Sequence, residues 1–261
     1  MNNLSLNLFY VACIFVLSCC LIACNEQETE MVEVDFGYDY FPLAIGKSWT
    51  YQIDSIFFDP AIGGTAIDTI ATFLQETIVD TFTNLEERTA YRVEQFFRRN
   101  PSEDWQLVKV FTLSRDENRA FRTEDNLTFV KLTFPAKVNN IWDGNAFLDE
   151  FLKVDIKGEQ VEFFKNWDYL ILEEGQLFEL DTFRFEQYLV VQNADDENLI
   201  ERRFAVERYA RGVGLITRDL EILDTQCEVC CNSDFEACEN LPWVEKAEKG
   251  LILKQRLIDY Q

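Results

Sequence analysis

Alternation of apolar and polar residues along short segments is the feature that most constrains the fold of this chain. In residues 49–54, Trp49, Tyr51 and Ile53 fall on one face of an extended strand and polar residues on the other. Further strands are expected at 67–73, 76–82, 91–98, 105–113, 119–123, 127–134, 183–191, 204–209, 213–223 and 251–260. The segments 67–73 and 76–82 could also be one long bent strand. Short polar turns separate them, so the pattern predicts a mostly β fold, a single antiparallel meander that forms a curved sheet or partly closed barrel.

Three segments depart from the strand pattern. Residues 149–180 are irregular and predict loops or a short helix. The acidic run 193–198 predicts a loop between two strands. One short C-terminal helix is expected at Trp243–Lys249, with Pro242 at its first position and Gly250 as its C-terminal cap.

Composition and charge argue against two kinds of binding partner. Hydrophobic residues make up 48% of the chain, enough for a core, and the net charge is −23. Nucleic acids are bound through Lys and Arg that replace counterions, so a chain this acidic is not expected to bind them. The same acidity disfavours adhesion to anionic lipid head groups.

The chain contains no His, which excludes Ser-His-Asp and Cys-His catalysis and the commonest zinc sites. No glycine-rich phosphate loop is present, and we expect no cofactor and no bound metal. Paired carboxylates leave a glycan hydrolase as an alternative, although acidic pairs such as Glu124-Asp125 are typical of solvated turns. Asp195-Asp196-Glu197 lacks the alternating ligands and central Gly of a calcium loop.

The N-terminus has the organisation of a lipoprotein signal peptide. Residues 1–24 contain no charged side chain, and their apolar run ends in Leu21-Ile22-Ala23-Cys24. This tetrapeptide resembles the lipobox of bacterial lipoproteins, which implies that Cys24 carries the lipid and becomes the new N-terminus. An uncleaved membrane helix is the alternative, because the apolar stretch is barely long enough to span a bilayer.

The segment that follows Cys24 is strongly acidic and is expected to be a solvated tether over residues 25–37. It also resembles the surface-export signal of Bacteroidota lipoproteins. We therefore expect a cell-envelope protein, anchored to the outer membrane through its lipid and facing either the periplasm or the outside. Residues 38–261 are expected to form a single β-rich domain.

Trp142-Asp143-Gly144-Asn145 is the most distinctive short motif of the domain. Asp-Gly indicates a tight turn, because Gly accepts a positive φ. Asp143 or Asn145 could also hydrogen-bond a ligand beside the ring of Trp142. A turn that anchors the chain is the preferred interpretation.

Four cysteines, Cys227, Cys230, Cys231 and Cys238, lie within twelve residues. Outside the cytoplasm such thiols are expected to oxidise to two disulfides. The expected pairings are Cys227–Cys230 with Cys231–Cys238, or Cys227–Cys231 with Cys230–Cys238. Zinc binding and free redox thiols are the alternatives.

Four stretches carry a resemblance to other proteins: the opening 40–51 with its Phe41-Pro42-Leu43, the motif 142–145, Tyr209–Ile216 and the closing 250–260. Together they resemble a group of uncharacterised Bacteroidota lipoproteins. The resemblance covers most of the mature chain and implies a compartment and an architecture, but no activity.

These observations favour a non-catalytic, lipid-anchored binding or envelope-structural module whose ligand or partner the sequence does not identify. One alternative is a carrier that holds an apolar ligand in the concavity of the sheet, which requires an apolar cavity with inward aromatic residues. The other is the glycan hydrolase, which requires two facing carboxylates, one of them with a raised pKa.

Overall fold

The structure, a computed structural model, describes residues 34–60 and 66–261. Residues Phe36–Gln261 form one compact unit. The predicted signal peptide with Cys24, and most of the predicted tether, lie outside the described residues. Across the part that is described, no helix combines the length and the apolar character that crossing a membrane requires.

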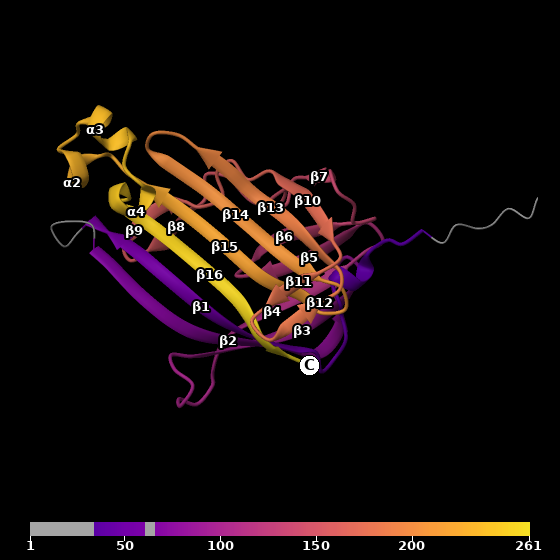
Figure 1. The fold of residues 1–261 in the computed structure, drawn as a ribbon. Helices are drawn as coiled ribbons and strands as arrows, with labels where there is room; N and C mark the ends of the chain where they lie inside the picture. The colour runs from indigo at the N-terminus through magenta and orange to yellow at the C-terminus, as the bar shows by residue number, and fades with distance from the viewer. Residues whose placement is uncertain (1–33, 61–65) are drawn as a thin grey trace, which may run out of the picture. The chain divides into compact units, whose positions relative to one another are not determined.

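Twelve antiparallel strands of the described chain form one large sheet that is nearly closed as a barrel (Figure 1). Its order is β6-β5-β4-β3-β2-β1-β16-β15-β14-β13-β10-β7. The strands are β1 (Ser48–Asp59), β2 (Ala66–Thr83), β3 (Thr89–Arg98), β4 (Gln106–Arg115), β5 (Arg119–Glu124), β6 (Leu127–Thr133), β7 (Ile141–Trp142), β10 (Tyr169–Gly175), β13 (Tyr188–Glu197), β14 (Glu201–Ala210), β15 (Gly214–Asp224) and β16 (Lys249–Tyr260).

Smaller elements complete the unit. Two hairpins pair β8 (Lys153–Ile156) with β9 (Glu159–Glu162), and β11 (Phe178–Leu180) with β12 (Phe183–Phe185). The helices are a 3-10 turn η1 (Tyr38–Tyr40) and three short α-helices, α2 (Glu228–Cys231), α3 (Phe235–Glu239) and α4 (Trp243–Lys246).

Two features bring the ends of the sheet together. The first long strand, β1, pairs with the last, β16, from Trp49 opposite Tyr260 to Phe58 opposite Gly250. The edge strands β6 and β7 meet where Val130 N–H donates to the Gly144 carbonyl at 2.8 Å and Trp142 Nε1 donates to the Val130 carbonyl at 2.9 Å. The unit Phe36–Gln261 contains the whole sheet and its core.

The observed fold class is the one that the sequence predicts, but some of the predicted strand boundaries are wrong. The segments 67–73 and 76–82 are one long strand, β2. The expected loop at 193–198 is wrong, because β13 continues to Glu197 and pairs with β14, with Glu197 opposite Arg202. Arg202 forms ion pairs with Glu197 and with Glu221 of β15, so cross-strand charge pairs stabilise an acidic strand end that the sequence alone marks as a turn.

The helix prediction also needs correction. The expected single helix ends at Lys246, and Gly250 is a residue of β16 rather than a helix cap. Two further helices, α2 and α3, form in the cysteine segment. Asp234 caps α3 by accepting a hydrogen bond from Ala237 N–H at 3.2 Å, a local signal of helix initiation.

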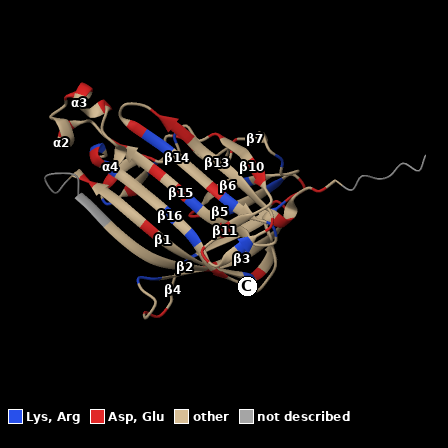
Figure 2. Cartoon of the chain, viewed as in Figure 1, with Lys and Arg blue, Asp and Glu red and all other residues tan. Residues whose placement is uncertain are grey.

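The interior of the sheet follows from strand alternation. Trp49, Tyr51 and Ile53 of β1 are buried, as their shared face predicts. They belong to a large apolar cluster with residues of η1, β10, β13 and β15. Charged residues of both signs lie along the strands (Figure 2), and some of them point inward.

Candidate functional site

A cluster of six charged side chains lies inside the sheet. Its members come from β2, β5, β6, β14 and β15 and line one or both of two neighbouring cavities: Glu76, Arg122, Glu124, Lys131, Glu207 and Arg218. The sheet register explains one contact directly, because Glu207 and Arg218 are opposite each other on β14 and β15. Arg122, Lys131 and Arg218 line both cavities and therefore lie at their common boundary.

Glu207 is the centre of this cluster. Its Oε1 accepts hydrogen bonds from Lys131 Nζ at 2.7 Å and from Arg218 Nε at 2.8 Å, and its Oε2 accepts one from the Tyr209 hydroxyl at 2.6 Å. Burial alone would raise the pKa of Glu207, but the charges of Lys131 and Arg218 outweigh it and hold that pKa well below its usual range. Glu207 therefore stays ionised, and the surrounding donors are fixed around it.

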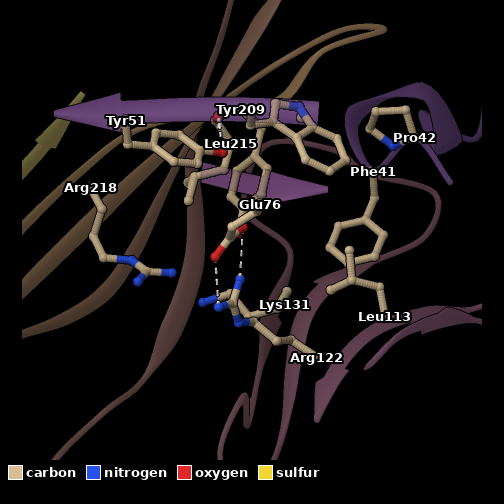
Figure 3. A pocket seen from close by; sticks show the side chains of 12 residues that line it. Phe41, Pro42, Tyr51, Glu76, Leu113, Arg122, Lys131, Tyr209, Leu215 and Arg218 are labelled. Carbon is tan, nitrogen blue, oxygen red and sulfur yellow. Dashed lines mark hydrogen bonds and ion pairs between the residues drawn. The ribbon is translucent and has the colours of Figure 1, made fainter. Parts of the chain in front are cut away.

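Arg122 organises the second half of the cluster (Figure 3). It donates to Glu76 through Nη2 at 2.9 Å and Nη1 at 3.3 Å, and to Glu124 through Nε at 3.1 Å and Nη2 at 2.9 Å. Its guanidinium also lies 3.8 Å from the ring centroid of Phe111. Burial alone would raise the pKa of Glu124, yet the charge of Arg122 lowers it to about 2.

Two other groups of the cluster keep hydrogen-bonding capacity. Within the described chain, Arg218 uses only Nε, and neither Nη1 nor Nη2 has a hydrogen-bond partner. Asn193 of β13 lines the larger cavity, is 1% exposed and has an amide nitrogen without a partner in the described residues. Burial lowers the pKa of Lys131 to about 8, against the opposing charge of Glu207.

The larger cavity has a volume of about 350 Å³ and is lined by aromatic side chains as well as by the charges. Phe164 lies at the centre of these aromatic side chains, with its ring centroid 4.9 Å from Phe163, 5.4 Å from Phe129 and 5.5 Å from Trp167. Trp167 is oriented by a hydrogen bond from its Nε1 to the Phe163 carbonyl at 2.9 Å. The cavity thus joins a polar, charged wall to a wall of aromatic rings.

The smaller cavity, of about 50 Å³, lies on the other side of the same cations, next to η1 (Figure 3). Trp49 and Tyr51 line it, and both are held by backbone carbonyls of the β14–β15 region: Trp49 Nε1 donates to Val213 at 2.6 Å and the Tyr51 hydroxyl to Leu215 at 3.0 Å. A space of this size accommodates one or two water molecules. The larger cavity is therefore the candidate ligand site.

The carboxylates at this site suit charge pairing rather than acid catalysis. A glycoside hydrolase needs one carboxyl group with a raised pKa to protonate the leaving group. The pKa values of Glu124 and Glu207 are both shifted downward, by Arg122 in one case and by Lys131 and Arg218 in the other. These two residues do not fit the role of the acid.

The motif residues Trp142, Asp143 and Asn145 do not line the cavity. The Asn145 Oδ1 accepts a hydrogen bond from the Tyr169 hydroxyl at 3.2 Å, and the Trp142 and Tyr169 rings lie 5.5 Å apart. Tyr169 itself lines the cavity. Asp143 Oδ1 accepts from Asn145 N–H at 2.9 Å, which closes a local turn.

Gly144 has a different physical role from the one expected. Its φ is not positive, so backbone freedom is not the reason for glycine here. A Cβ at this position would lie 2.2 Å from the Tyr169 ring. Glycine leaves the space that Tyr169 occupies beside the cavity.

The cysteine segment forms a separate cluster between β15 and β16. Cys227 is bonded to Cys238, a connectivity that differs from both expected pairings. The short helices α2 and α3 bring these two residues to a Cα–Cα distance of 5.9 Å. Cys230 and Cys231 remain as thiols with their sulfur atoms 2.7 Å apart.

Removing this disulfide should cost moderate stability, because a loop this short constrains little chain entropy. For Cys227→Ala/Cys238→Ala we expect the free energy of unfolding to fall by about 2–3 kcal/mol in urea denaturation. Cys230→Ala/Cys231→Ala is the matched control and should change it by less than about 1 kcal/mol. Peptide mapping that joins Cys227 to Cys230 or Cys231 would contradict the connectivity.

Comparison with known proteins adds little to the site. No family model matches the chain, and no curated protein matches it. Two solved structures are similar: a candidate lipoprotein of Parabacteroides distasonis, with 11% identity and a TM-score of 0.35, and a candidate exported protein with a YmcC-like fold from Bacteroides fragilis, with 8% identity and a TM-score of 0.36. Each similarity covers 85% of this chain and 98% of the other. At these TM-scores, the role of this chain has to be argued from its own residues.

Proposed function

We propose that the protein is a lipid-anchored, non-catalytic module of the bacterial cell envelope that binds a small ligand inside its sheet. The observation that carries the proposal is the cavity of about 350 Å³ with one charged and one aromatic wall. Ligand sites in proteins have volumes of roughly 300–1,000 Å³ and combine apolar walls with a few placed polar groups. This cavity has both properties.

The packing around the cavity supports binding rather than a purely structural role. A core that served stability alone would fill this volume with side chains, because protein interiors pack closely. Here Ala205 and Leu220 border the space on β14 and β15, and their side chains leave it open. The apolar-ligand carrier is the nearest alternative, and the charged wall distinguishes the present proposal from it.

Filling the cavity tests the proposal. The protein, purified from its own envelope without denaturation, should carry a small-molecule adduct in native mass spectrometry. Leu220→Trp should abolish that adduct because the indole fills the cavity. Ala205→Phe provides a second cavity-filling variant on the neighbouring strand β14. Val110→Trp, at a position that is 48% exposed on β4, is the control and should retain it. An adduct that persists in both cavity variants, or is absent from the wild type, would refute the proposal.

The anchor is a separate part of the proposal and rests on Leu21-Ile22-Ala23-Cys24. Cys24→Ala should abolish metabolic labelling with a palmitate analogue and prevent signal cleavage, because the lipid is attached through this thiol. Cys19→Ala is the control and should be labelled normally. Labelling that persists in Cys24→Ala and disappears in Cys19→Ala would show that Cys19, and not Cys24, carries the lipid.

A further inference from the structure

The unpartnered groups of the larger cavity are hydrogen-bond donors. Arg218 keeps Nη1 and Nη2 without a partner, while its Nε is held by Glu207 at 2.8 Å. The buried amide nitrogen of Asn193 is likewise without a partner among the described residues. The Asn193 nitrogen is buried, and an unmade hydrogen bond inside a protein is costly, so this donor calls for an acceptor. The Arg218 side chain is 26% exposed, so its two terminal nitrogens are accessible to a ligand. The two free Arg218 nitrogens form a fork that suits a carboxylate, which accepts two parallel hydrogen bonds.

The aromatic lining of the cavity sets the rest of the ligand. Phe129, Phe163, Phe164 and Trp167 offer ring faces and edges to the cavity, and none of them presents a charge. A ligand that reaches both walls is therefore polar at one end and apolar at the other. At about 30 Å³ for each water-sized group, the volume holds on the order of ten non-hydrogen atoms.

We propose that the ligand is a small amphipathic carboxylate, with its anionic head on Arg218 and Asn193 and its apolar body against the aromatic wall. This inference rests on the proposed function and specifies its ligand class. Lys131 contributes a second cation at 2.7 Å from Glu207 and 5.9 Å from the Tyr169 ring centroid. The preformed network positions the donors before the ligand arrives, which reduces the cost of ordering them on binding.

The test compares two pairs of probes by isothermal titration calorimetry on the mature chain, residues 25–261. Each pair matches an anion with a neutral counterpart: decanoate with 1-decanol, and 2-naphthoate with methyl 2-naphthoate. At least one anion should bind at least about tenfold more tightly than its neutral counterpart. Which pair shows the larger preference reports whether the aromatic wall takes a chain or a flat ring.

Variants assign that preference to Arg218. Arg218→Gln should remove the tenfold preference, and Arg218→Lys, which keeps the charge beside Glu207 but loses the fork, should retain part of it. Arg208→Gln is the matched control, because Arg208 is the neighbour of Glu207 on β14 and pairs with Asp219 rather than lining the cavity. Circular dichroism checks that each variant is folded. If Arg218→Gln does not fold, Arg218→Lys decides the question: a preference reduced below that of the wild type supports the assignment, and an undiminished preference overturns it.

The possible outcomes separate this inference from the proposed function. Equal binding of anions and neutral probes, or a preference that both Arg218 variants leave at the wild-type value, overturns the carboxylate assignment while leaving a ligand-binding cavity. Failure of all four probes to bind the wild type also overturns it. The proposed function itself is then decided by the adduct and the cavity-filling variants.

Discussion

Glu207→Ala is expected to destabilise the domain by about 3–5 kcal/mol, because it leaves the buried Lys131 and the partly buried Arg218 without their shared partner. Lys131 and Arg218 both donate to Glu207 Oε1, and the Glu207 side chain is only 3% exposed. The carboxylate offsets the cost of taking the two cations out of water. Removing it leaves that cost without compensation. Urea denaturation followed by circular dichroism measures the loss.

Two variants make this result specific. Glu221→Ala removes a carboxylate of β15 that pairs with Arg202 and is 31% exposed, and exposed pairs contribute only about 0–1 kcal/mol. Adding Lys131→Met to Glu207→Ala removes one of the stranded cations and should recover part of the stability. A loss below about 1 kcal/mol for Glu207→Ala would contradict the assigned role.

The Glu207 carboxyl group also determines how stability depends on pH. The pKa of Glu207 is lowered in the folded state, so as the pH falls the unfolded chain takes up the proton first. The stabilisation by Glu207 is therefore fully present above about pH 4.5 and decreases as the pH falls below it, toward the folded pKa. The stability difference between wild type and Glu207→Ala should shrink over that acidic window.

The sheet was predictable because its information is local. Alternation along each segment marks the buried face, and strands that follow one another at short spacing pair with their neighbours, as β2 to β6 do. The pairing of β1 with β16 was not predictable in this way, since its register joins residues from opposite ends of the domain. No local pattern records where a curved sheet closes.

The site was harder to predict for the same reason. Lys131 lies in a run of four consecutive buried residues of β6, 129–132, so alternation does not mark one inward face, and sequence analysis overlooked a lysine inside this apolar run. Its partner Glu207 is 76 residues away, and their contact depends on the closure of the sheet. The cysteine pairing failed differently, because spacing alone does not show that two short helices bring Cys227 to Cys238.

Gly250→Ala is expected to cost about 3–5 kcal/mol, which places it among the most damaging single substitutions. Gly250 lies between two strands, opposite Phe58 of β1 and Leu223 of β15, with φ at +112°. A Cβ there would lie 1.9 Å from the Ile222 carbonyl oxygen, a backbone atom that cannot move aside without breaking the sheet.

Gly158→Ala is the matched control, because Gly158 also has a positive φ, of +92°, but nothing within 4 Å of the added methyl. The control should show backbone strain alone, about 1–2 kcal/mol. Urea denaturation of both variants separates the two contributions, and equal losses would mean that the close approach of β15 does not matter.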